Sequence, residues 1–407
     1  MPVFQLKLAA RNLTRHHMRT LISLLAIAFG VIAFLISGGF IEWIFWAIQD
    51  AAIKNGLGHI QISRPNFRDA GLANPSAYLL PPSGAELNIV RSVPQVEAVD
   101  ERLALSGLAS SGEVTVAFTG EAVDPEADRQ IFKPLLPPEG ENLIKSNPKG
   151  VLLGRGLAAA LGVKPGDRVS LVVSLPGGGI NAVEGHVLGR FSTGVKAYDD
   201  RVVRMPVALG RELLRVQGSH LWVVGLSATE HTDEIVAQLR ARLPSDRFEV
   251  TSWFELSDFY RKSVVLLSRQ VDVVALLIGV IIVLGISNTL TMNVLERTGE
   301  IGTMMAMGKR RREVLQLFVL EGLLLGVIGG LSGLVIGYLL AQALSYVGIP
   351  MPPPPGRDAG YSAEIMLTVR LTLWAFVMAV ASTTLASLYP AWKASRLPIV
   401  DALRHNR

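Results

Sequence analysis

The sequence predicts an α-helical membrane protein with four transmembrane helices and a large α+β extracytoplasmic domain inserted between the first and second helices. Three observations favour this fold class. Four separate stretches are apolar over about 20 residues, the length that a helix needs to cross a bilayer core. A polar segment of more than 200 residues separates the first stretch from the second. Lysine and arginine residues flank the apolar stretches on one side much more than on the other.

The four predicted spans follow from the apolar runs. Residues 21–46 contain the first transmembrane helix and the beginning of a stalk, and the run continues as IEWIFWAI with no small-residue cleavage site. We therefore expect an uncleaved anchor rather than a signal peptide. The remaining spans are predicted at 271–293, 314–344 and 371–389. The third is longer than a bilayer requires, so we expect it to tilt or to project.

The distribution of basic residues predicts the topology. Lysines and arginines number four in residues 1–20, five in the loop 294–313 and four in the tail 390–407, but only two in the loop 345–370. Short cytoplasmic loops are enriched in these residues. Both termini and the loop 294–313 should therefore be cytoplasmic, with residues 1–20 an amphipathic segment. The loop 345–370, with its proline-rich run at 349–356, should lie outside as a spacer or a rim element.

Residues 47–262 are predicted to form the extracytoplasmic α+β domain, joined to the membrane by helical stalks at about 41–54 and 254–270. Runs rich in β-branched residues predict strands at 58–63, 113–120, 167–174, 201–209 and 221–228. Helical spacing of apolar residues predicts helices at 84–93, 155–163 and 231–243. A strand–helix–strand order recurs near each end (58–123 and 221–252), and about 150–215 is predicted to be an inserted β-rich lobe.

The motifs that would carry chemistry are missing from the chain. No phosphate-binding loop of the form GxxxxGK[ST] occurs, because Gly308-Lys309 is followed by Arg310. The sequence holds no cysteine and no HExxH motif, and its seven histidines are scattered except for His16-His17. We therefore expect no catalytic site, no metal and no bound cofactor. The basic residues flank the spans, so they indicate topology rather than a nucleic-acid partner.

The segment Glu300 to Met307, between the second and third spans, is short and amphipathic. Ile301, Met304, Met305 and Met307 would offer an adaptable apolar surface, and Lys309 to Arg312 follow. The residues alone leave two interpretations open. The segment is either a helix that docks a cytosolic partner or an ordinary interfacial helix followed by a positive cluster.

This region resembles the permease domain of the FtsX and MacB superfamily. The residues that match its pattern are Asn288, Met292, Val294, Glu296, Arg297, Glu300, Ile301, Gly302, Gly308, Glu321 and Gly322. The opening LAARNLTRHHMRTLIS and the run YPAWKASR near the C-terminus also resemble the superfamily. The matches occur in three places and in the expected order.

The resemblance implies a multi-pass permease of the cell inner membrane that works with a separate cytosolic P-loop ATPase dimer. ATP and Mg would be bound by that partner, and a second permease copy or a paralogue would complete a dimer. The loop would supply a coupling helix over residues 300–308. Its contacts to the ATPase would be made by Glu300, Ile301, Gly302, Met304, Met305, Met307 and Gly308. Gly302→Pro is expected to uncouple ATP hydrolysis from function, because proline disrupts a helix interior.

Two further features lie in the third span. Glu321 is an ionisable residue at membrane depth, and Arg297 is its predicted partner in a structural ion pair rather than a proton path. A stripe of small residues permits close helix approach and comprises Gly326, Gly329, Gly330, Gly333 and Gly337. The stripe serves either a dimer contact or packing within one subunit, and the sequence leaves both open.

Residues 150–174 and 185–209 resemble the lipoprotein-releasing (LolC/LolE-like) permeases. That branch implies mechanotransmission: closure of the ATPases moves the coupling helices and stalks, and lipoproteins or other lipid-linked cargo are released outward. Membrane lipids and a periplasmic lipoprotein or carrier would then be partners. In that branch a loop between these two stretches helps to recruit the carrier, and the corresponding loop here, 174–183, is shorter and glycine-rich, which leaves the carrier contact open. A MacB-like peptide or drug efflux permease and an FtsX-like activator of cell-wall hydrolases remain alternatives.

Overall fold

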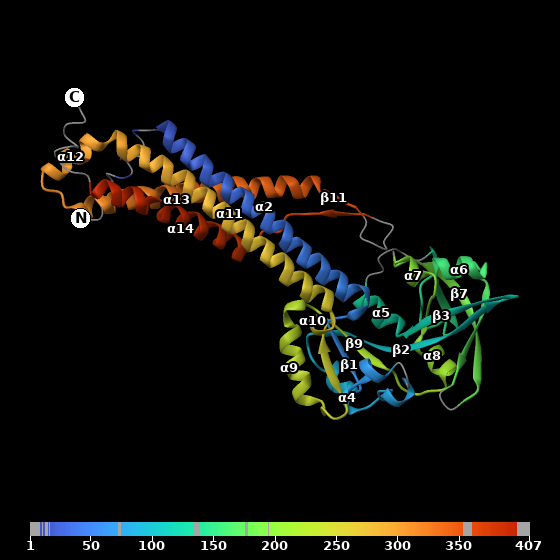
Figure 1. The fold of residues 1–407 in the computed structure, drawn as a ribbon. Helices are drawn as coiled ribbons and strands as arrows, with labels where there is room; N and C mark the ends of the chain where they lie inside the picture. The colour runs from blue at the N-terminus through green and yellow to red at the C-terminus, as the bar shows by residue number, and fades with distance from the viewer. Residues whose placement is uncertain are drawn as a thin grey trace. The chain divides into compact units, whose positions relative to one another are not determined.

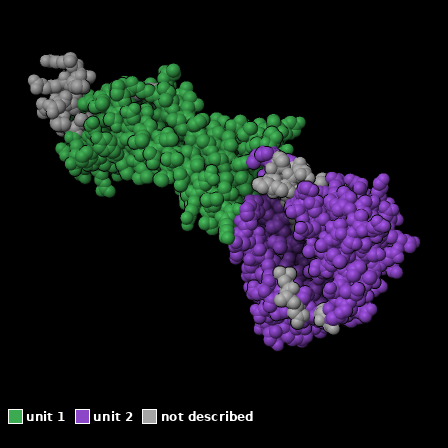
Figure 2. Space-filling view, turned by 45° about the vertical axis from the view of Figure 1, so that its right-hand side comes forward, with its two compact units in different colours: residues 1–46, 262–350, 362–407 green, residues 47–261, 351–361 purple. Residues whose placement is uncertain are grey.

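The computed structural model describes residues 9, 11–12, 15, 17–71, 75–132, 139–175, 178–193, 195–352 and 360–396. The chain divides into two compact units, coloured separately in Figure 2. Unit 1 comprises residues 1–46, 262–350 and 362–407, and unit 2 comprises residues 47–261 and 351–361.

Unit 1 is helical (Figure 1). Its helices are α2 (His17–Ala52), α11 (Asp258–Glu296), α12 (Thr298–Ala306), α13 (Arg311–Val347) and α14 (Val369–Ser395). All but α12 are long and apolar enough to cross a membrane, judged by length and composition. Each of the four extends beyond the apolar run that predicted it, because polar residues continue the helix at one or both ends. A short two-stranded sheet, β11 (Ile349–Met351) and β12 (Tyr361–Ala363), lies between α13 and α14 in the sequence.

The four long helices pack closely where one of them carries a small residue. A Cβ atom added at Gly30 of α2 would lie 2.9 Å from Ile282 of α11, and one at Gly38 would lie 2.6 Å from Leu371 of α14. The packed core of the bundle includes Ile27, Phe34 and Ile286. Helix α2 therefore contacts the other three spans, while α11 keeps most of its surface exposed.

Unit 2 is an α+β fold around a mixed sheet. Its strands are β1 (Ile60–Ser63), β2 (Val96–Ser111), β3 (Val114–Val123), β4 (Glu139–Gly140), β5 (Gly150–Gly154), β6 (Arg168–Ser174), β7 (Ile180–Phe191), β8 (Val202–Pro206), β9 (Leu221–Leu226) and β10 (Glu249–Ser252). Its longer helices are α4 (Ala85–Arg91), α5 (Pro125–Ile131), α6 (Arg155–Leu161), α8 (Val207–Leu214) and α9 (Thr232–Arg242). Shorter turns are η1 (Ile53–Leu57), α3 (Phe67–Ala70), η2 (Pro75–Tyr78), α7 (Lys196–Asp199), η3 (Thr229–His231) and α10 (Trp253–Leu256).

The strands follow the order β10-β1-β9-β2-β3-β8-β5-β7-β4, and β6 bridges β2 and β7. The long strand β2 divides the sheet into two lobes. Lobe A contains β10, β1, β9 and residues 96–102 of β2, and it is packed around Ile60, Trp222 and Leu239. Lobe B contains residues 103–111 of β2 with β3 to β8, and its core includes Leu153 and Met205.

The pattern of strands differs from the predicted one in several respects, and five strands, β2, β4, β5, β7 and β10, lie outside the runs predicted as strands. The run 201–209 is a strand only to Pro206, and Val207 begins α8, because the buried Leu209 and Leu213 follow helical spacing. Strands 150–206 also do not form a sheet of their own, since β6 pairs with β2 and β8 pairs with β3. The β-rich lobe therefore includes β2 and β3, which precede the predicted stretch.

Candidate coupling site

Helix α12 connects the second and third spans. It begins at Thr298 and ends at Ala306, and Gly308 follows with a φ of +94°. Glycine reaches this left-handed region without steric cost, which is why it ends helices. The helix was predicted at 300–308 and lies two residues earlier, at 298–306. Met307 and Gly308 follow its last residue.

One face of α12 is buried within the chain. Ile301 is fully buried and Met305 is 8% exposed, and both pack with Phe318 and other apolar residues of α11, α13 and α14. Gly302 is buried beside them. The expectation that Ile301 and Met305 offer their side chains to a partner was wrong, because the ends of the flanking helices leave an apolar surface that α12 covers.

The opposite face of α12 is open. Thr303 and Ala306 are exposed, Met304 is half-buried, and Met307 is 74% exposed. Lys309 is half-buried and Arg310 is exposed just after the helix. This face therefore presents small and flexible side chains with a positive charge at one end.

The predicted pair of Arg297 and Glu321 is brought together by the fold. Arg297 Nη1 lies 3.3 Å from Glu321 Oε1, and the two side chains are 7% and 1% exposed. Arg297 Nε also donates to Glu300 Oε2 at 3.1 Å, and its guanidinium lies 5.8 Å from the ring centroid of Phe318. Asn12 Nδ2 donates to Glu321 Oε1 at 2.6 Å. One arginine thus ties the first turn of α12 to a buried acid of α13.

The N-terminal segment contributes contacts that the sequence did not predict. Arg15 Nη1 donates to Glu300 Oε1 at 2.6 Å, and Arg19 forms a bidentate pair with Glu296. Burial alone would raise the pKa of the Glu300 carboxyl, but the hydrogen bonds and charges of Arg297 and Arg15 hold it below its usual value. The basic residues of 1–20 were interpreted only as a topology signal. The pair of acids four residues apart at 296 and 300 was the clue to a binding role.

The glycine stripe of α13 packs within one chain. A Cβ atom at Gly326 would lie 2.1 Å from Thr383 Oγ1 of α14, and one at Gly330 would lie 3.2 Å from Phe376. At Gly333 it would lie 3.0 Å from the carbonyl oxygen of Ala28 in α2. The next two glycines that were singled out, Gly329 and Gly337, also face α2, through Ile27 and Leu35. The stripe therefore seats α2 and α14 against α13, which answers the question that the sequence left open.

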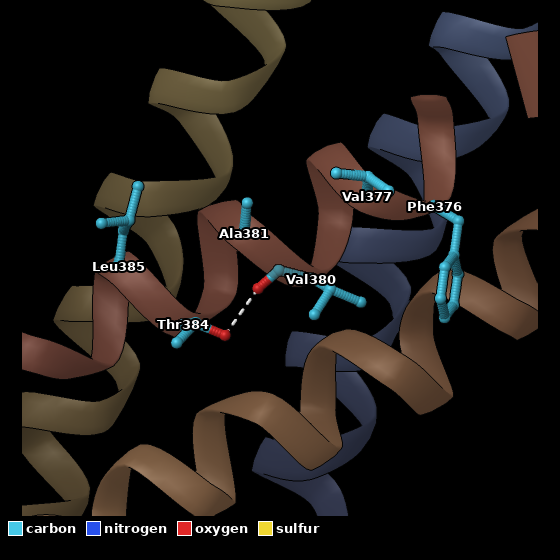
Figure 3. A pocket seen from close by; sticks show the side chains of 6 residues that line it. All are labelled: Phe376, Val377, Val380, Ala381, Thr384 and Leu385. Atoms are coloured by element: carbon cyan, nitrogen blue, oxygen red, sulfur yellow. Dashed lines mark hydrogen bonds between the residues drawn. The ribbon is translucent and has the colours of Figure 1, made fainter. Parts of the chain in front are cut away.

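An apolar groove of about 500 Å³ lies on α14 (Figure 3). Its lining residues are Phe376, Val377, Val380, Ala381, Thr384 and Leu385. The hydroxyl of Thr384 donates to the carbonyl oxygen of Val380 at 2.7 Å, so the groove offers aliphatic and aromatic surface rather than polar groups. Among the described residues, no group of three or more His, Asp or Glu is placed to hold a metal ion.

Comparison with known families places this geometry in context. The model of the MacB-like periplasmic core domain matches residues 20–242, more than half of the chain. The chain belongs to the MacB-like family. The model of the FtsX-like permease C-terminal region matches residues 273–399, which include α12 and the helices on both sides. The resemblance to the FtsX and MacB superfamily is thereby confirmed.

The individual relatives include lipoprotein-releasing and export permeases. The lipoprotein-releasing system transmembrane protein LolC of Xylella fastidiosa is 26% identical over 64% of this chain and 66% of its own length. The macrolide export ATP-binding/permease protein MacB of Syntrophobacter fumaroxidans is 29% identical over 45% of this chain and 25% of its own length. This MacB-like chain thus spans less than two thirds of each of these relatives. The periplasmic region of MacB from Actinobacillus actinomycetemcomitans, a solved structure, aligns at 12% identity with a TM-score of 0.37, covering 51% of this chain and 94% of its own.

Proposed function

We propose that this chain is the transmembrane permease subunit of an ABC transporter of the mechanotransmission type. Cytosolic ATP hydrolysis by a partner P-loop ATPase dimer would move α12, and the movement would reach the extracytoplasmic domain through α2 and α11. This chain itself would be non-catalytic, with ATP and Mg bound by the partner. Both termini and α12 would be cytoplasmic, and unit 2 would lie outside the inner membrane.

The observation that carries the proposal is the two-sided character of α12. Its inner face is fixed to the spans by the buried Ile301 and Met305 and by the ion pairs of Arg297. Its outer face keeps Met307 and Thr303 free for a partner. A helix that is rigidly joined to the membrane core on one side and open on the other transmits a displacement rather than absorbing it. The ATPase would move α12 only if its contacts with this helix differ between its ATP-bound and ATP-free states.

A second copy of the chain, or a paralogue, would pack on α11. Only 17% of the 18-residue apolar stretch of α11 is buried, against 33% to 44% of the corresponding stretches in the other three spans. Its open face includes Leu277, Ile281 and Leu284, and it continues to the exposed amide of Asn288. Amide side chains within apolar spans favour helix association, because they form hydrogen bonds across helices. The dimer contact is therefore assigned to α11, since α2 and α14 already occupy the glycine stripe of α13.

The cargo we propose is a lipoprotein or another lipid-linked molecule, handed outward to a periplasmic carrier. The LolC relatives align over more of this chain than the MacB and pyoverdine-export relatives do, which supports this branch. Export of a peptide or a drug is the alternative within the same architecture. An FtsX-like signalling role would share the ATPase partner but move no cargo.

The test is affinity purification of the chain in mild detergent, followed by identification of what accompanies it and by measurement of ATP hydrolysis. Because the sequence has no cysteine, Met307→Cys supplies a single thiol for crosslinking. We expect a P-loop ATPase to co-purify and to crosslink through position 307, whereas Met305→Cys, which lies on the buried face, should not crosslink. Bound lipoprotein would select the proposed branch.

Gly302→Pro examines the coupling step in the same preparation. Proline in the interior of α12 breaks the helix, so ATP hydrolysis should continue while cargo release is lost. Gly302→Ala is the matched control, because it changes the same residue while alanine favours helix. A chain that purifies alone and crosslinks to nothing through position 307 would refute the ABC assignment, and an unaffected Gly302→Pro variant would refute the role of α12.

A further inference from the structure

A buried cluster of charged residues lies in unit 2 where β2 changes its partner. Arg102 is the last residue of β2 that pairs with β9, opposite Leu221, and Leu103 is the first that pairs with β3, opposite Ala122. His220 closes the changeover. Its backbone N–H donates to the Arg102 carbonyl at 2.8 Å, and its Nδ1 accepts from the backbone N–H of Ala104 at 3.1 Å. The boundary between the two lobes is thus fixed at Arg102, because its neighbouring backbone groups are satisfied there.

The side chain of Arg102 reaches four different elements, including β3, where its Nη1 lies 3.9 Å from Glu121 Oε2. Nε donates to Asp100 Oδ2 at 2.6 Å within β2, and Nη2 donates to Asp128 Oδ1 at 3.1 Å in α5. Nη1 donates to the carbonyl oxygen of Gly56 at 3.2 Å, and the guanidinium lies 4.2 Å from the centroid of the Phe132 ring. The side chain is 7% exposed. The planar fork of arginine makes such divergent contacts, which the single ammonium of lysine does not reproduce.

The contact with Gly56 links the cluster to the stalk. Gly56 lies in η1, the turn in which α2 ends, and its φ of +151° departs from helical values. Nothing lies within 4 Å of the position that a Cβ atom would take there, so contact does not force the bend. A backbone at this φ suits glycine, which has no Cβ atom to clash. The carbonyl oxygen of Gly56 accepts the hydrogen bond from Arg102. The turn η1, at the end of the stalk, is thereby hydrogen-bonded to β2 at the lobe boundary.

A second arginine extends the cluster into lobe B. Arg204 of β8 donates to Asp128 at 2.7 Å from Nη2 and at 3.3 Å from Nη1, so Asp128 is shared between Arg102 and Arg204. Arg204 is also the cross-strand neighbour of Glu121 in β3, with Nη2 and Oε2 3.7 Å apart. Asp100 accepts from the backbone N–H of Asp124 at 2.7 Å, which fixes the beginning of α5. The chain of contacts therefore runs from η1 through Arg102 and Asp128 to the sheet of lobe B.

We propose that Arg102 is a positioning residue that transmits displacement of the stalk end, residues 53–57, to both lobes of unit 2. The inference rests on the proposed function, which requires the stalks to move the extracytoplasmic domain. Stability alone does not require a buried ionic cluster here, since well-packed apolar residues often stabilise a fold equally well. The directional hydrogen bonds of this cluster join η1, α5 and β8 through the shared side chains of Arg102 and Asp128.

Hydrogen–deuterium exchange of the full chain in detergent tests the proposal without any partner. In Arg102→Met, amides of η1 and α5 should exchange at least tenfold faster, including the N–H of Gly58, which bonds to Ile53, and that of Phe132, which bonds to Asp128. Arg211→Met is the matched control. Arg211 forms a part-buried pair with Glu101, at 2.6 Å, and donates to the carbonyl oxygen of Gly218 at 3.1 Å, and neither partner lies in η1 or α5. That variant should leave exchange in both elements unchanged.

Arg102→Lys separates positioning from simple maintenance of the fold. It keeps the charge and loses the fork, so we expect faster exchange in η1 and α5 with wild-type protection in β5, β6 and β9. Equal exchange of η1 in Arg102→Met and Arg211→Met would overturn the proposal. A uniform loss of protection throughout both lobes in Arg102→Lys would also overturn it, because the residue would then only hold the domain together. Absence of an ATPase partner would instead refute the proposed function and leave the exchange result standing.

Discussion

Removal of the arginine at the centre of the coupling site gives the most direct measure of how α12 is joined to the spans. Arg297 and Glu321 are 7% and 1% exposed, and their charged atoms are 3.3 Å apart. In Arg297→Met, the carboxylate keeps the hydrogen bond from Asn12, at 2.6 Å, but loses its positive neighbour. Loss of one partner of a buried pair costs about 3–5 kcal/mol, because the other charge stays buried and uncompensated.

The reverse variant should cost less. In Glu321→Gln, Arg297 keeps Glu300 as a partner at 3.1 Å and the ring of Phe318 at 5.8 Å. A hydrogen bond to a charged group contributes about 1.5–3 kcal/mol, which sets the expected loss. The double variant Arg297→Met/Glu321→Gln leaves no uncompensated charge between the two positions. Its loss of stability should therefore be smaller than the sum of the two single losses by about 0.5–3 kcal/mol, the coupling energy found between residues in contact.

The assay is equilibrium unfolding of the four proteins in one detergent, with the free energy of unfolding taken from the same denaturant series. The ATPase activity of the co-purified complex is measured beside it. We expect the double variant to recover much of the stability but not the coupling of hydrolysis to cargo release, because the link from α13 to the beginning of α12 is gone. Additive losses within about 0.5 kcal/mol would refute the reasoning, since they are typical of sites that do not interact.

Three further predictions follow from the same structure. Met307→Ser should lower partner-stimulated ATP hydrolysis at an unchanged melting temperature, whereas Met305→Ser should lower the melting temperature; equal effects on both readouts would contradict the two faces of α12. Gly333→Val should destabilise the chain, since an added Cβ atom meets α2 at 2.8–3.0 Å. Gly285→Val, with nothing within 4 Å of its Cβ position, should weaken only the proposed dimer, as measured by light scattering. Burial raises the pKa of Asp100 to about 6, so the folded domain holds this proton more tightly than the unfolded chain does. Its contribution to stability therefore falls as pH rises from about 4 to about 6, and Asp100→Asn should gain stability relative to wild type over that interval. A difference that does not change with pH would argue against this reasoning.

The local patterns of the chain determined its class and the place of its spans. The apolar runs are long enough to cross a membrane as helices. In a helix each backbone N–H and C=O is hydrogen-bonded within its own segment, so no polar group is left unsatisfied in lipid. The short helix α12 was also predictable from nearby residues. Gly308 ends a helix, and the acidic and basic residues around it lie within one or two turns. The partnership of Arg297 with Glu321 was also within reach, because a carboxylate at membrane depth requires a partner.

Only the tertiary structure decided which face of each element is used. Ile301 and Met305 follow the same periodicity whether they face a partner or the chain's own helices, and packing against Phe318 settled that they are buried. The glycines of α13 carry no side chain that names their neighbour, so their contacts with α2 and α14 followed from the arrangement of the bundle. Arg102 has an ordinary strand context in sequence, and its partners come from positions 46 and 26 residues away. Sequence determines local conformation through nearby residues, whereas burial and ion pairing depend on distant segments that meet only when the chain has folded.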